Sequence, residues 1–455
     1  MIRHFINRHK ELQVLEKEWD KPTASLIIVY GRRRIGKTRL LSEFTRDKSG
    51  VLFFAEDTAP RVQIEGLKTL ISQYLQDPLL ADLPIYTWSQ LFDYLSSHQP
   101  NQRSYLIIDE FSYLIKSDQS VLSAIQKAWD MRLSASPWVI ILTGSLLGLM
   151  SDAALSHTSP LYGRRDRDIL LKSLPFSEAK KFLQGSFETC LQMYFIIGGI
   201  PEYLNRAGEY SDIDAFTSNE FYDMFGYFYR EPYFLLSQEF RELKIYQSIL
   251  GSLASGRTTP SEIATSIGLD TRNLYPYLES MIRLGFVEKE SSIIGSPKKS
   301  IYRISDSLLD FWYTFVFPNR RFIELSHPLT PAHTHFFGRK FEVFIREEVI
   351  SRLYPGQDAG RWWHKEEEID CIVFDSRNHS VVFCECKYSR LTLSKAYQVL
   401  HTLEKKAELV PFDMNVWKSK KFCLFVRNVE EKEKLMKERY LVYDIRDIEK
   451  LYSDA

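Results

Sequence analysis

The chain of 455 residues lacks the features of several protein classes. Its five cysteines form no CxxC pair, which is typical of reduced thiols rather than of a disulfide framework. Lys plus Arg and Asp plus Glu both number 59, so no overall positive field attracts nucleic acid, and such a role requires a local patch. The longest apolar stretch, Val139–Met150, is interrupted by Thr143-Gly144-Ser145 and is shorter than the roughly 20 residues of a membrane helix. The first residues lack the apolar centre of a signal peptide, so we expect a cytoplasmic protein without membrane attachment.

The length and the residue pattern instead indicate a multidomain protein with α/β and α+β parts. At about 100–200 residues per domain, two to four domains are expected. Five continuous apolar runs are typical of strands buried on both faces of a parallel sheet. These runs are Ser25–Tyr30, Val51–Ala55, Tyr105–Ile108, Trp138–Leu142 and Asp168–Leu171. The longer segments between them predict crossover helices, so residues 1–173 are expected to form an α/β domain.

Three further domains are predicted after residue 173. Residues 174–238 have a helical, aromatic-rich pattern, which predicts a helical lid. Residues 239–306 predict three helices followed by a β-hairpin, the outline of a winged helix-turn-helix. We expect the third of these helices to begin near Asn273, because Pro276 is then in its first turn. Residues 307–455 again mix helices and strands.

A phosphate-binding pattern, G-x-x-x-x-G-K-[ST], lies between the first predicted strand and a predicted helix over residues 39–46. In this pattern backbone N–H groups wrap phosphate oxygens, Lys37 reaches the β- and γ-phosphates, and the Thr38 hydroxyl binds Mg²⁺. The predicted nucleotide contacts are Gly31, Arg32, Arg33, Arg34, Ile35, Gly36, Lys37, Thr38 and Arg39. The three consecutive arginines either add positive charge near the phosphates or bind structural partners.

The strand predicted at 105–108 ends in two carboxylates, Asp109 and Glu110. Ligands of open α/β sheets bind at this end of the strands. We expect Asp109 to hold Mg²⁺ through water, and Glu110 to orient and deprotonate the attacking water. Thr143 and Ser145, after the next predicted strand, are either a polar sensor of the γ-phosphate or an ordinary turn. Together these residues predict magnesium-dependent binding and hydrolysis of ATP.

Several segments, in this order, resemble the archaeal-type ATPase family, P-loop proteins of the class that includes AAA+ and STAND ATPases. They are FINRHKEL near the start, GRRRIGKT, LIIDEFSYL, SPLYGRR (Ser159–Arg165), GGIPEYL (Gly198–Leu204) and YRISDSLLDFWYTFVFPN (Tyr302–Asn319). The resemblance implies an AAA+-like domain, a lid and a C-terminal domain of unknown function. It also implies that Pro201 packs near the adenine. Arg164 or Arg165 is implied as an arginine finger or sensor, with a solvated basic turn as the alternative.

The C-terminal domain is predicted to contain a β-hairpin that ends in Glu385-x-Lys387. Because side chains alternate along a strand, Glu385 and Lys387 share one face. With Asp370 before the hairpin and Glu342 on a helix predicted over 338–353, this arrangement resembles the PD-(D/E)xK, restriction-endonuclease-like core. The resemblance implies that Glu342, Asp370 and Glu385 bind Mg²⁺ and that Lys387 orients the attacking hydroxide. The alternative is a solvated ion pair on an inactive scaffold.

These features predict an ATPase whose ATP hydrolysis moves the winged helix and the nuclease-like domain on DNA or RNA. The winged helix either contacts DNA through its third helix, with Lys298 and Lys299 nearby, or serves as a packing module. The alternative function is a STAND-type switch. In that case bound ATP or ADP controls assembly of a homo-oligomer, and the nuclease-like domain is an inactive scaffold.

Overall fold

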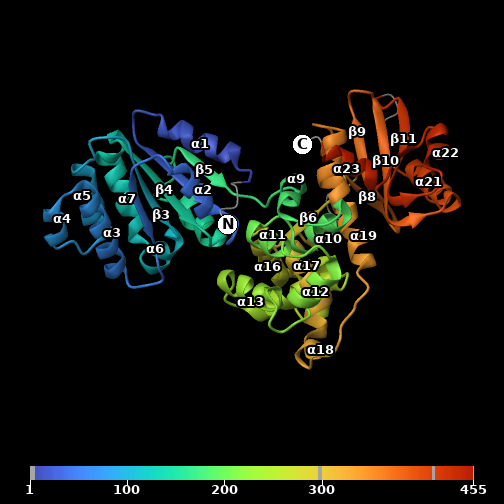
Figure 1. Cartoon of the computed structure of the whole chain (residues 1–455), viewed down its shortest axis with the longest axis horizontal. Helices are drawn as coiled ribbons and strands as arrows, with labels where there is room; N and C mark the ends of the chain where they lie inside the picture. Colours follow the sequence, from blue (N-terminus) through green and yellow to red (C-terminus); the bar gives the residue numbers. More distant parts are fainter. Residues whose placement is uncertain (1–5, 296–299, 412–415, 454–455) are drawn as a thin grey trace. The chain divides into compact units, whose positions relative to one another are not determined.

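The computed structural model describes residues 6–295, 300–411 and 416–453. The chain separates into two compact units, coloured along the sequence in Figure 1. The first unit comprises residues 1–174 together with Ile200–Glu202, and the second comprises the rest. The finer division into four domains stays a prediction. Lys298 and Lys299, predicted to lie near DNA, are outside the described residues.

A parallel five-stranded sheet forms the centre of the first unit. Its strands are β1 (Ser25–Tyr30), β2 (Gly50–Phe54), β3 (Ser104–Asp109), β4 (Trp138–Gly144) and β5 (Arg167–Leu170). All five apolar runs of the sequence form strands, as predicted. The strand order is β2-β3-β4-β1-β5, so β4 separates β1 from β3.

Helices cover both faces of this sheet (Figure 1). They are α1 (His9–Trp19), α2 (Lys37–Phe44), α3 (Pro60–Leu75), α4 (Pro78–Asp82), α5 (Trp88–Ser97), α6 (Phe111–Ser117), α7 (Ser120–Met131) and α8 (Leu147–Leu149). Leu26 and Ile28 of β1 share a core cluster with buried residues of α3, α5, α6 and α7. Because alternate residues of a strand face opposite sides, the neighbouring Ile27 and Val29 fill the other face, and all four side chains are fully buried.

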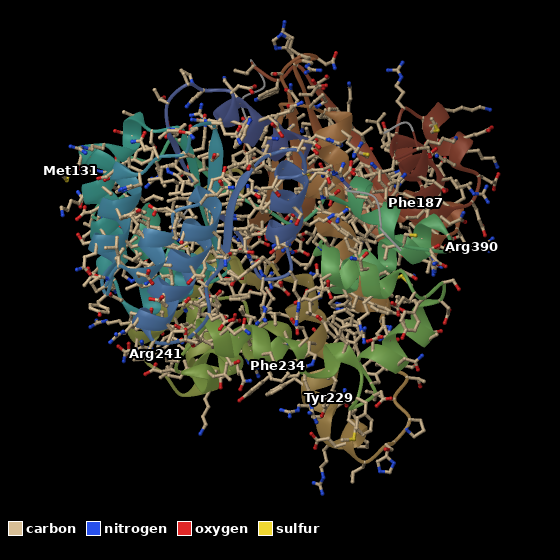
Figure 2. The ribbon with its side chains drawn as sticks, turned by 60° about the vertical axis from the view of Figure 1, so that its left-hand side comes forward. Met131, Phe187, Tyr229, Phe234, Arg241 and Arg390 are labelled. Carbon is tan, nitrogen blue, oxygen red and sulfur yellow. The ribbon has the colours of Figure 1, made fainter. Side chains whose placement is uncertain are left out.

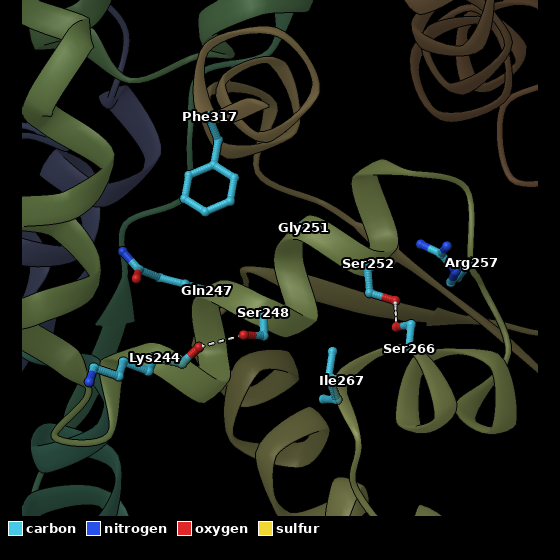
Figure 3. A pocket seen from close by; sticks show the side chains of 9 residues that line it. All are labelled: Lys244, Gln247, Ser248, Gly251, Ser252, Arg257, Ser266, Ile267 and Phe317. Atoms are coloured by element: carbon cyan, nitrogen blue, oxygen red, sulfur yellow. Dashed lines mark hydrogen bonds between the residues drawn. The ribbon is translucent and has the colours of Figure 1, made fainter. Parts of the chain in front are cut away.

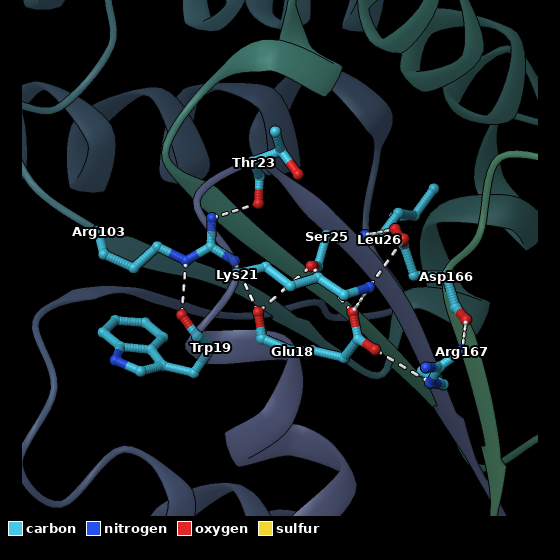
Figure 4. A network of polar contacts seen from close by, with 9 residues as sticks. All are labelled: Glu18, Trp19, Lys21, Thr23, Ser25, Leu26, Arg103, Asp166 and Arg167. Atoms are coloured by element: carbon cyan, nitrogen blue, oxygen red, sulfur yellow. Dashed lines mark hydrogen bonds and ion pairs between the residues drawn. The ribbon is translucent and has the colours of Figure 1, made fainter.

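A buried carboxylate, Glu18, fastens α1 to the beginnings of β1 and β5 (Figure 4). Its side chain is 0% exposed and forms ion pairs with Lys21 and with Arg167, whose Nε lies 3.0 Å from Oε1. The Ser25 hydroxyl donates a hydrogen bond of 3.1 Å to the other carboxylate oxygen. Because a buried charge is costly without partners, these three groups are needed to keep Glu18 in place.

Removal of both cations, as Lys21→Met with Arg167→Met, is expected to lower the free energy of unfolding by about 3–5 kcal/mol, because Glu18 stays buried without a counter-ion. Glu18→Gln is expected to cost only about 1–3 kcal/mol, since the partly exposed cations then turn to water. Lys116→Met, which breaks an exposed pair with Asp57, is the control and should cost less than about 1 kcal/mol. Calorimetry of the full chain measures these changes. Equal losses in the double variant and the control would contradict the role of Glu18.

The second unit begins with a helical segment rich in aromatic side chains. Its helices are α9 (Phe176–Ala179), α10 (Phe187–Ile197), α11 (Pro201–Ala207), α12 (Ile213–Glu220) and α13 (Tyr227–Glu239). Phe187 on α10 and Tyr229 and Phe234 on α13 are examples of these side chains (Figure 2). Within α11, residues 201 and 202 belong to the first unit, so the chain passes briefly back to the parallel-sheet unit at this point.

Three helices and an antiparallel hairpin follow, in the order that the sequence predicts for a winged helix-turn-helix. They are α14 (Leu243–Ala254), α15 (Pro260–Ile267), α16 (Thr271–Arg283), β6 (Val287–Glu290) and β7 (Ile301–Ile304). The predicted start of the third helix near Asn273 is wrong. The side chain of Asp270 caps α16 by accepting a hydrogen bond of 2.7 Å from the backbone N–H of Arg272, so the helix begins at Thr271. Pro276 therefore lies inside the helix rather than in its first turn.

The C-terminal part contains a mixed five-stranded sheet in the order β12-β11-β10-β9-β8. Its strands are β8 (Asp358–His364), β9 (Glu367–Asp375), β10 (Ser380–Leu391), β11 (Ser419–Val429) and β12 (Leu441–Tyr443). The first three are antiparallel neighbours, and β11 and β12 continue parallel to β10. The helices of this part are α17 (Ser307–Phe311), α18 (Arg320–Glu324), α19 (Thr334–Phe344), α20 (Ile350–Leu353), α21 (Leu393–Glu408), α22 (Lys432–Lys437) and α23 (Ile445–Leu451). The helix predicted over 338–353 begins earlier, at Thr334, and continues through a π-helical turn at Ile345–Val349.

All five cysteines are buried and none forms a disulfide. Cys371, Cys384 and Cys423 lie side by side on β9, β10 and β11. Their burial is that of small apolar side chains in a core. Within the described ranges, no helix is both long enough and apolar enough to cross a membrane.

Candidate functional site

The loop between β1 and α2 has the backbone that the phosphate-binding pattern requires. Gly36 and Arg34 have φ values of 95° and 67°, in the left-handed region. A Cβ on Gly31 would lie 2.8 Å from the carbonyl oxygen of Leu171, so a larger residue would displace the backbone. Helix α2 begins at Lys37, two residues before the predicted start. Because the first N–H groups of a helix lack intrahelical partners, this end of α2 can accept phosphate oxygens.

The Lys37 ammonium lies within the loop. Lys37 is 5% exposed, and its Nζ donates hydrogen bonds to the carbonyl oxygens of Gly31 (3.0 Å) and Arg32 (3.3 Å). Ile35 is buried beneath the loop, whereas Arg33 and Arg39 are exposed. The sequence-predicted contact residues therefore divide into those that shape the loop and those that face outward.

A hydroxyl of the loop is joined directly to the carboxylate at the end of β3. Thr38 Oγ1 donates a hydrogen bond of 2.9 Å to Asp109 Oδ2. The other carboxylate oxygen accepts hydrogen bonds from the Thr143 hydroxyl and from the backbone N–H of Glu110, the latter at 3.0 Å. Asp109 is 2% exposed, so these donors are what allow a carboxylate to remain there. A hydroxyl and a carboxylate side by side form a set of hard oxygen ligands that fits Mg²⁺.

Glu110 lies next to this pair and is held by Ser145. The Ser145 hydroxyl and backbone N–H donate to Glu110 Oε2 at 2.6 and 3.2 Å. Glu110 itself has a left-handed backbone (φ 54°, ψ 38°) where β3 passes into α6. Such a conformation costs about 1–3 kcal/mol in a residue with a side chain, and it is frequent at functional sites.

The strand order explains why these side chains meet. β4 lies between β1 and β3, with Val29 opposite Thr143 and Ile108 opposite Leu142. The end of β4 therefore projects Thr143 and Ser145 between the loop after β1 and the carboxylates after β3. The sequence left open whether these two residues act at the site or form an ordinary turn. In the structure both are hydrogen-bonded to the carboxylates of residues 109 and 110.

Pro201 lies beside the same loop, although it is far away in sequence. Its Cγ is 4.0 Å from the position that a Cβ on Gly36 would occupy. Residues 200–202 belong to the first unit, whereas the residues on either side belong to the second. The motif Gly198–Leu204 thus brings a short piece of chain to the nucleotide loop.

Arg164 and Arg165 lie near the start of β5. Nε and Nη2 of the Arg164 guanidinium each donate to an oxygen of the Asp130 carboxylate at 2.7 Å. Arg165 Nε lies 3.6 Å from Asp168 Oδ2. Because β5 runs parallel to β1, the backbone of these arginines lies near the beginning of β1, whereas the phosphate loop follows its end. Their assignment as finger or sensor stays a prediction.

A second set of charged side chains lies in the C-terminal sheet. Asp370 on β9 is 5% exposed and accepts a hydrogen bond of 2.8 Å from the backbone N–H of Cys386. Glu385 on β10 is 8% exposed, and its Oε1 lies 2.7 Å from Lys387 Nζ. Its Oε2 is buried and accepts no hydrogen bond from the described groups, with Lys406 Nζ 3.9 Å away. Asp370, Glu385 and Lys387 are therefore close together, as the sequence predicts.

The charges of this set interact strongly. Burial, followed by the charge of Glu385, raises the pKa of Asp370 to about 6. Burial, followed by the charge of Asp370, raises the pKa of Glu342 to about 8. Burial acts to lower the pKa of Lys387, but Glu385 beside it outweighs this effect and the net pKa is raised. Acidic groups with raised pKa values would become easier to ionise beside a divalent cation.

The metal ligands implied by the nuclease resemblance fit only in part. Asp370 and Glu385 are neighbours, and Glu385 Oε2 is a buried oxygen without a donor among the described groups, as a metal ligand would be. Within the described ranges, however, no set of three or more His, Cys, Asp or Glu side chains is arranged to hold a metal ion. The two strand carboxylates therefore fit the implied metal better than Glu342 does, and burial and the charge of Asp370 act on Glu342 to raise its pKa.

Three cations near this set were not anticipated from the sequence. Arg346 Nη1 lies 3.4 Å from the carbonyl oxygen of Asp370, Lys406 approaches Glu385, and the charge of Arg361 lowers the pKa of Asp370. Arg346 and Lys406 come from helices, whose packing on a strand has no signature in the local sequence.

The hairpin of β6 and β7 is bonded to the C-terminal part. Arg303 Nη2 lies 2.6 Å from Glu347 Oε1, and Arg346 Nη2 lies 3.1 Å from Glu290 Oε1. The backbone N–H of Ile293 also donates to the carbonyl oxygen of residue 361 at 2.9 Å. The described part of this hairpin thus packs against the C-terminal part.

A cavity of about 560 Å³ lies beside α14 and α15 (Figure 3). Lys244, Gln247 and Arg257 line it, and Phe317 forms part of its wall. The hydroxyls of Ser252 and Ser266, which also line it, are hydrogen-bonded to each other at 2.7 Å. The cavity contains none of the residues that the sequence predicts for nucleotide or metal binding.

Residues 5–207 match the family model of an ATPase domain found predominantly in archaea. This part of the chain is therefore similar to that ATPase family. Residues 312–399 match a second family, described as archaeal and bacterial proteins of unknown function. The two matches follow the order that the sequence motifs predict, an archaeal-type ATPase segment before a C-terminal segment similar to the second family.

A relative of similar length aligns with nearly the whole chain. The chain is 29% identical over 446 residues to an uncharacterised protein of Methanocaldococcus jannaschii, which covers 94% of this chain and 97% of that protein. An uncharacterised ATP-binding protein of the same organism is 52% identical over 44 residues, 10% of this chain and 75% of that protein.

Solved structures are also similar to this chain. A Walker-type ATPase of Pyrococcus abyssi is 20% identical, covers 68% of this chain and 96% of that chain, and has a TM-score of 0.47. The ORC2 protein of Aeropyrum pernix, solved as ADPNP–ADP complexes, is 13% identical and covers 72% of this chain and 97% of that chain, with a TM-score of 0.45. The fold of the ATPase domain is defined here by its own strand order and phosphate loop.

Proposed function

We propose that the ATPase domain binds and hydrolyses ATP with Mg²⁺, and that this cycle moves the winged-helix and nuclease-like parts on nucleic acid. The observation that carries the proposal is the hydrogen bond of 2.9 Å between Thr38 Oγ1 and Asp109 Oδ2. It brings the hydroxyl of the phosphate loop to the carboxylate at the tip of β3, where a magnesium ion needs both.

Each residue of the nucleotide site has a distinct role in this proposal. The Lys37 ammonium exchanges its two loop carbonyls for phosphate oxygens. Thr38 and Asp109 would hold Mg²⁺, which would neutralise charge on the β- and γ-phosphates. Thr143 fixes the orientation of Asp109, and Ser145 fixes Glu110, which accepts a proton from the attacking water. Pro201 borders the nucleotide beside Gly36.

The proposed nucleic-acid partner is DNA or RNA. It would contact α16 and the acidic set of the C-terminal sheet, by which we mean Asp370, Glu385 and the neighbouring Lys387. The exposed face of α16 carries Arg272 and Tyr275, which suit contacts with phosphates and bases. Asp370 and Glu385 would hold a divalent cation, which lowers the pKa of a bound water. Lys387, whose Nζ lies beside Glu385, would orient the attacking water.

A second candidate function is a STAND-type switch, in which ATP or ADP controls assembly of a homo-oligomer and the nuclease-like part is an inactive scaffold. The observation that favours it is the packing of the wing. The charged side chains of the hairpin form ion pairs within the protein. Arg303 pairs with Glu290 and Glu347, and Glu290 also pairs with Arg346. A wing used for packing supports a structural role of the winged helix.

Lys37→Ala is expected to weaken ATP binding at least about 100-fold, about 2.7 kcal/mol, because the phosphates lose their buried cation. Glu110→Gln is expected to keep ATP affinity but to lower turnover by about 10²–10⁴-fold, because the proton acceptor is lost. Calorimetric titration and phosphate release measure the two effects. Lys116→Ala, at an exposed position, is the matched control. Normal turnover by Glu110→Gln would show that Glu110 is not the base.

Mn²⁺ is expected to stabilise the full chain more at about pH 8 than at about pH 5.5. The pKa values of Asp370 and Glu342 are raised above those of the unfolded chain, so these groups stabilise the metal-free fold below about pH 4, and this contribution is lost as the pH rises through about 6 to 8. A divalent cation offsets that loss, by about 2.7 kcal/mol at about 100 times its dissociation constant.

Thermal unfolding with and without Mn²⁺ measures this stabilisation. Asp370→Asn is expected to abolish the difference between the two pH values. Asp375→Asn is the matched control, because Asp375 lies on the same strand and is bonded to Asn378 instead. An unchanged effect of Mn²⁺ in Asp370→Asn would contradict metal binding by this carboxylate.

Cleavage of single-stranded and double-stranded DNA and RNA by the full chain with Mg²⁺ or Mn²⁺ separates the two candidate functions. The nuclease proposal predicts cleavage that Lys387→Gln lowers by about 10²–10⁴-fold. Lys395→Gln, outside the acidic set, is the control. The switch predicts no cleavage, together with a molar mass by light scattering that differs between ADP and a non-hydrolysable ATP analogue.

A further inference from the structure

Helix α10 contacts the C-terminal sheet, and in the chain it is followed directly by the segment that contains Pro201. The helix belongs to the second unit, and Gly198-Gly199 connects it to Ile200–Glu202, which belong to the ATPase unit. Pro201 of this short piece lies beside Gly36. A displacement of Pro201 on nucleotide binding would therefore act on the C-terminal end of α10 through only two glycines and Ile200.

Polar side chains of α10 bind one tyrosine of the C-terminal sheet. Gln192 Nε2 donates to Tyr388 Oη at 3.2 Å, and Tyr388 Oη donates to Glu188 Oε1 at 2.9 Å. Arg427 on β11 also forms an ion pair of 2.5 Å with Glu188. Glu188 thus contacts donors on two strands of the sheet, Tyr388 on β10 and Arg427 on β11. A shift of α10 would therefore change the hydrogen bonds of Tyr388.

Further contacts fix the same helix against α19 and its continuation. Tyr194 Oη donates to Glu348 Oε1 at 2.7 Å, and the backbone N–H of Phe176 donates to the other oxygen of Glu348 at 2.9 Å. The ring of Phe195 lies 5.8 Å from that of Phe344, centroid to centroid. These contacts make α10 part of the surroundings of the C-terminal sheet rather than a free linker.

Tyr388 is the next residue after Lys387 on β10. Since alternate side chains of a strand face opposite sides, Tyr388 holds the strand from the face opposite Lys387 and Glu385. The β10–β11 register shifts between Lys387 and Arg390. Irregularities of this kind redirect neighbouring side chains and are frequent beside active sites. The direction of Lys387 is therefore sensitive to how Tyr388 is held.

The connection between α10 and the nucleotide loop has a glycine at its pivot. Gly198 has φ 67° and ψ −156°, a conformation that only glycine adopts readily. Hinges of moving segments are a few such positions at the ends of regular elements.

We propose that α10 transmits the nucleotide state of the ATPase domain to Lys387, with Tyr388 as the positioning residue. This inference rests on the proposed function, because it requires nucleotide at the phosphate loop. Pro201 lies beside Gly36, so a change of the phosphate loop between ATP and ADP displaces Pro201. Helix α10 carries this displacement over about 14 Å, from Ile197 to Glu188. Glu188 and Gln192 then pass it to the Tyr388 hydroxyl. The direction of the Lys387 side chain beside Glu385 therefore differs between the two nucleotide states.

Hydrogen–deuterium exchange of the full chain tests this coupling without requiring cleavage. Exchange is compared between Mg²⁺ with ADP and Mg²⁺ with a non-hydrolysable ATP analogue. In the wild type we expect the exchange rate of residues 385–391 to differ at least about fivefold between the two nucleotides. Tyr388→Phe and Glu188→Ala are expected to reduce this difference to less than about twofold, while ATP turnover stays within about twofold of the wild type.

Tyr440→Phe is the matched control. It removes a similar tyrosine–glutamate hydrogen bond of 2.8 Å, to Glu404, in the same sheet domain but outside the path. It should keep both the nucleotide-dependent exchange and the turnover. Protection of residues 31–38 by nucleotide without any difference at 385–391 would overturn the role of α10, and so would a difference retained in Tyr388→Phe and Glu188→Ala. Absence of protection at 31–38 would instead contradict the proposed ATP site itself.

Discussion

The hydrogen bond between Thr38 and Asp109 depends on two strands that are not neighbours in the sheet. β4 lies between them, and its Thr143 bonds to the same carboxylate. A buried carboxylate at this point would be unstable without such donors. The site therefore requires that β4 lie between β1 and β3, so that the phosphate loop and the polar end of β4 both reach Asp109. The nucleotide site is therefore a consequence of the packing of the whole parallel sheet.

The two acidic sites of the chain differ in how their charges are compensated. Asp109 and Glu110 are held by hydroxyl and backbone donors from the phosphate loop and β4. Asp370 is crowded by another carboxylate, and its pKa is raised, first by burial. The first arrangement is ready to receive a hydrated cation with a nucleotide. The second is stabilised by whatever positive charge approaches it, from Lys387, Lys406 or a divalent ion.

The sequence predicted those features that depend on local pattern. The five parallel strands, the phosphate loop and the shared face of Glu385 and Lys387 follow from apolar runs, a motif and the alternation of a strand. The start of α16 was predicted wrongly, because the capping side chain of Asp270 outweighs the restriction set by Pro276. The contacts of Tyr388 with α10 were not predicted, since they join residues about 200 positions apart and depend on tertiary packing.

A structure of the protein with Mg²⁺ and a non-hydrolysable ATP analogue tests the central claim most directly. The account predicts Mg²⁺ bound to Thr38 Oγ1 at about 2.0–2.1 Å, with Asp109 contacting its water ligands and Lys37 between the β- and γ-phosphates. A triphosphate bound elsewhere, with the Thr38–Asp109 hydrogen bond unaltered, would contradict it.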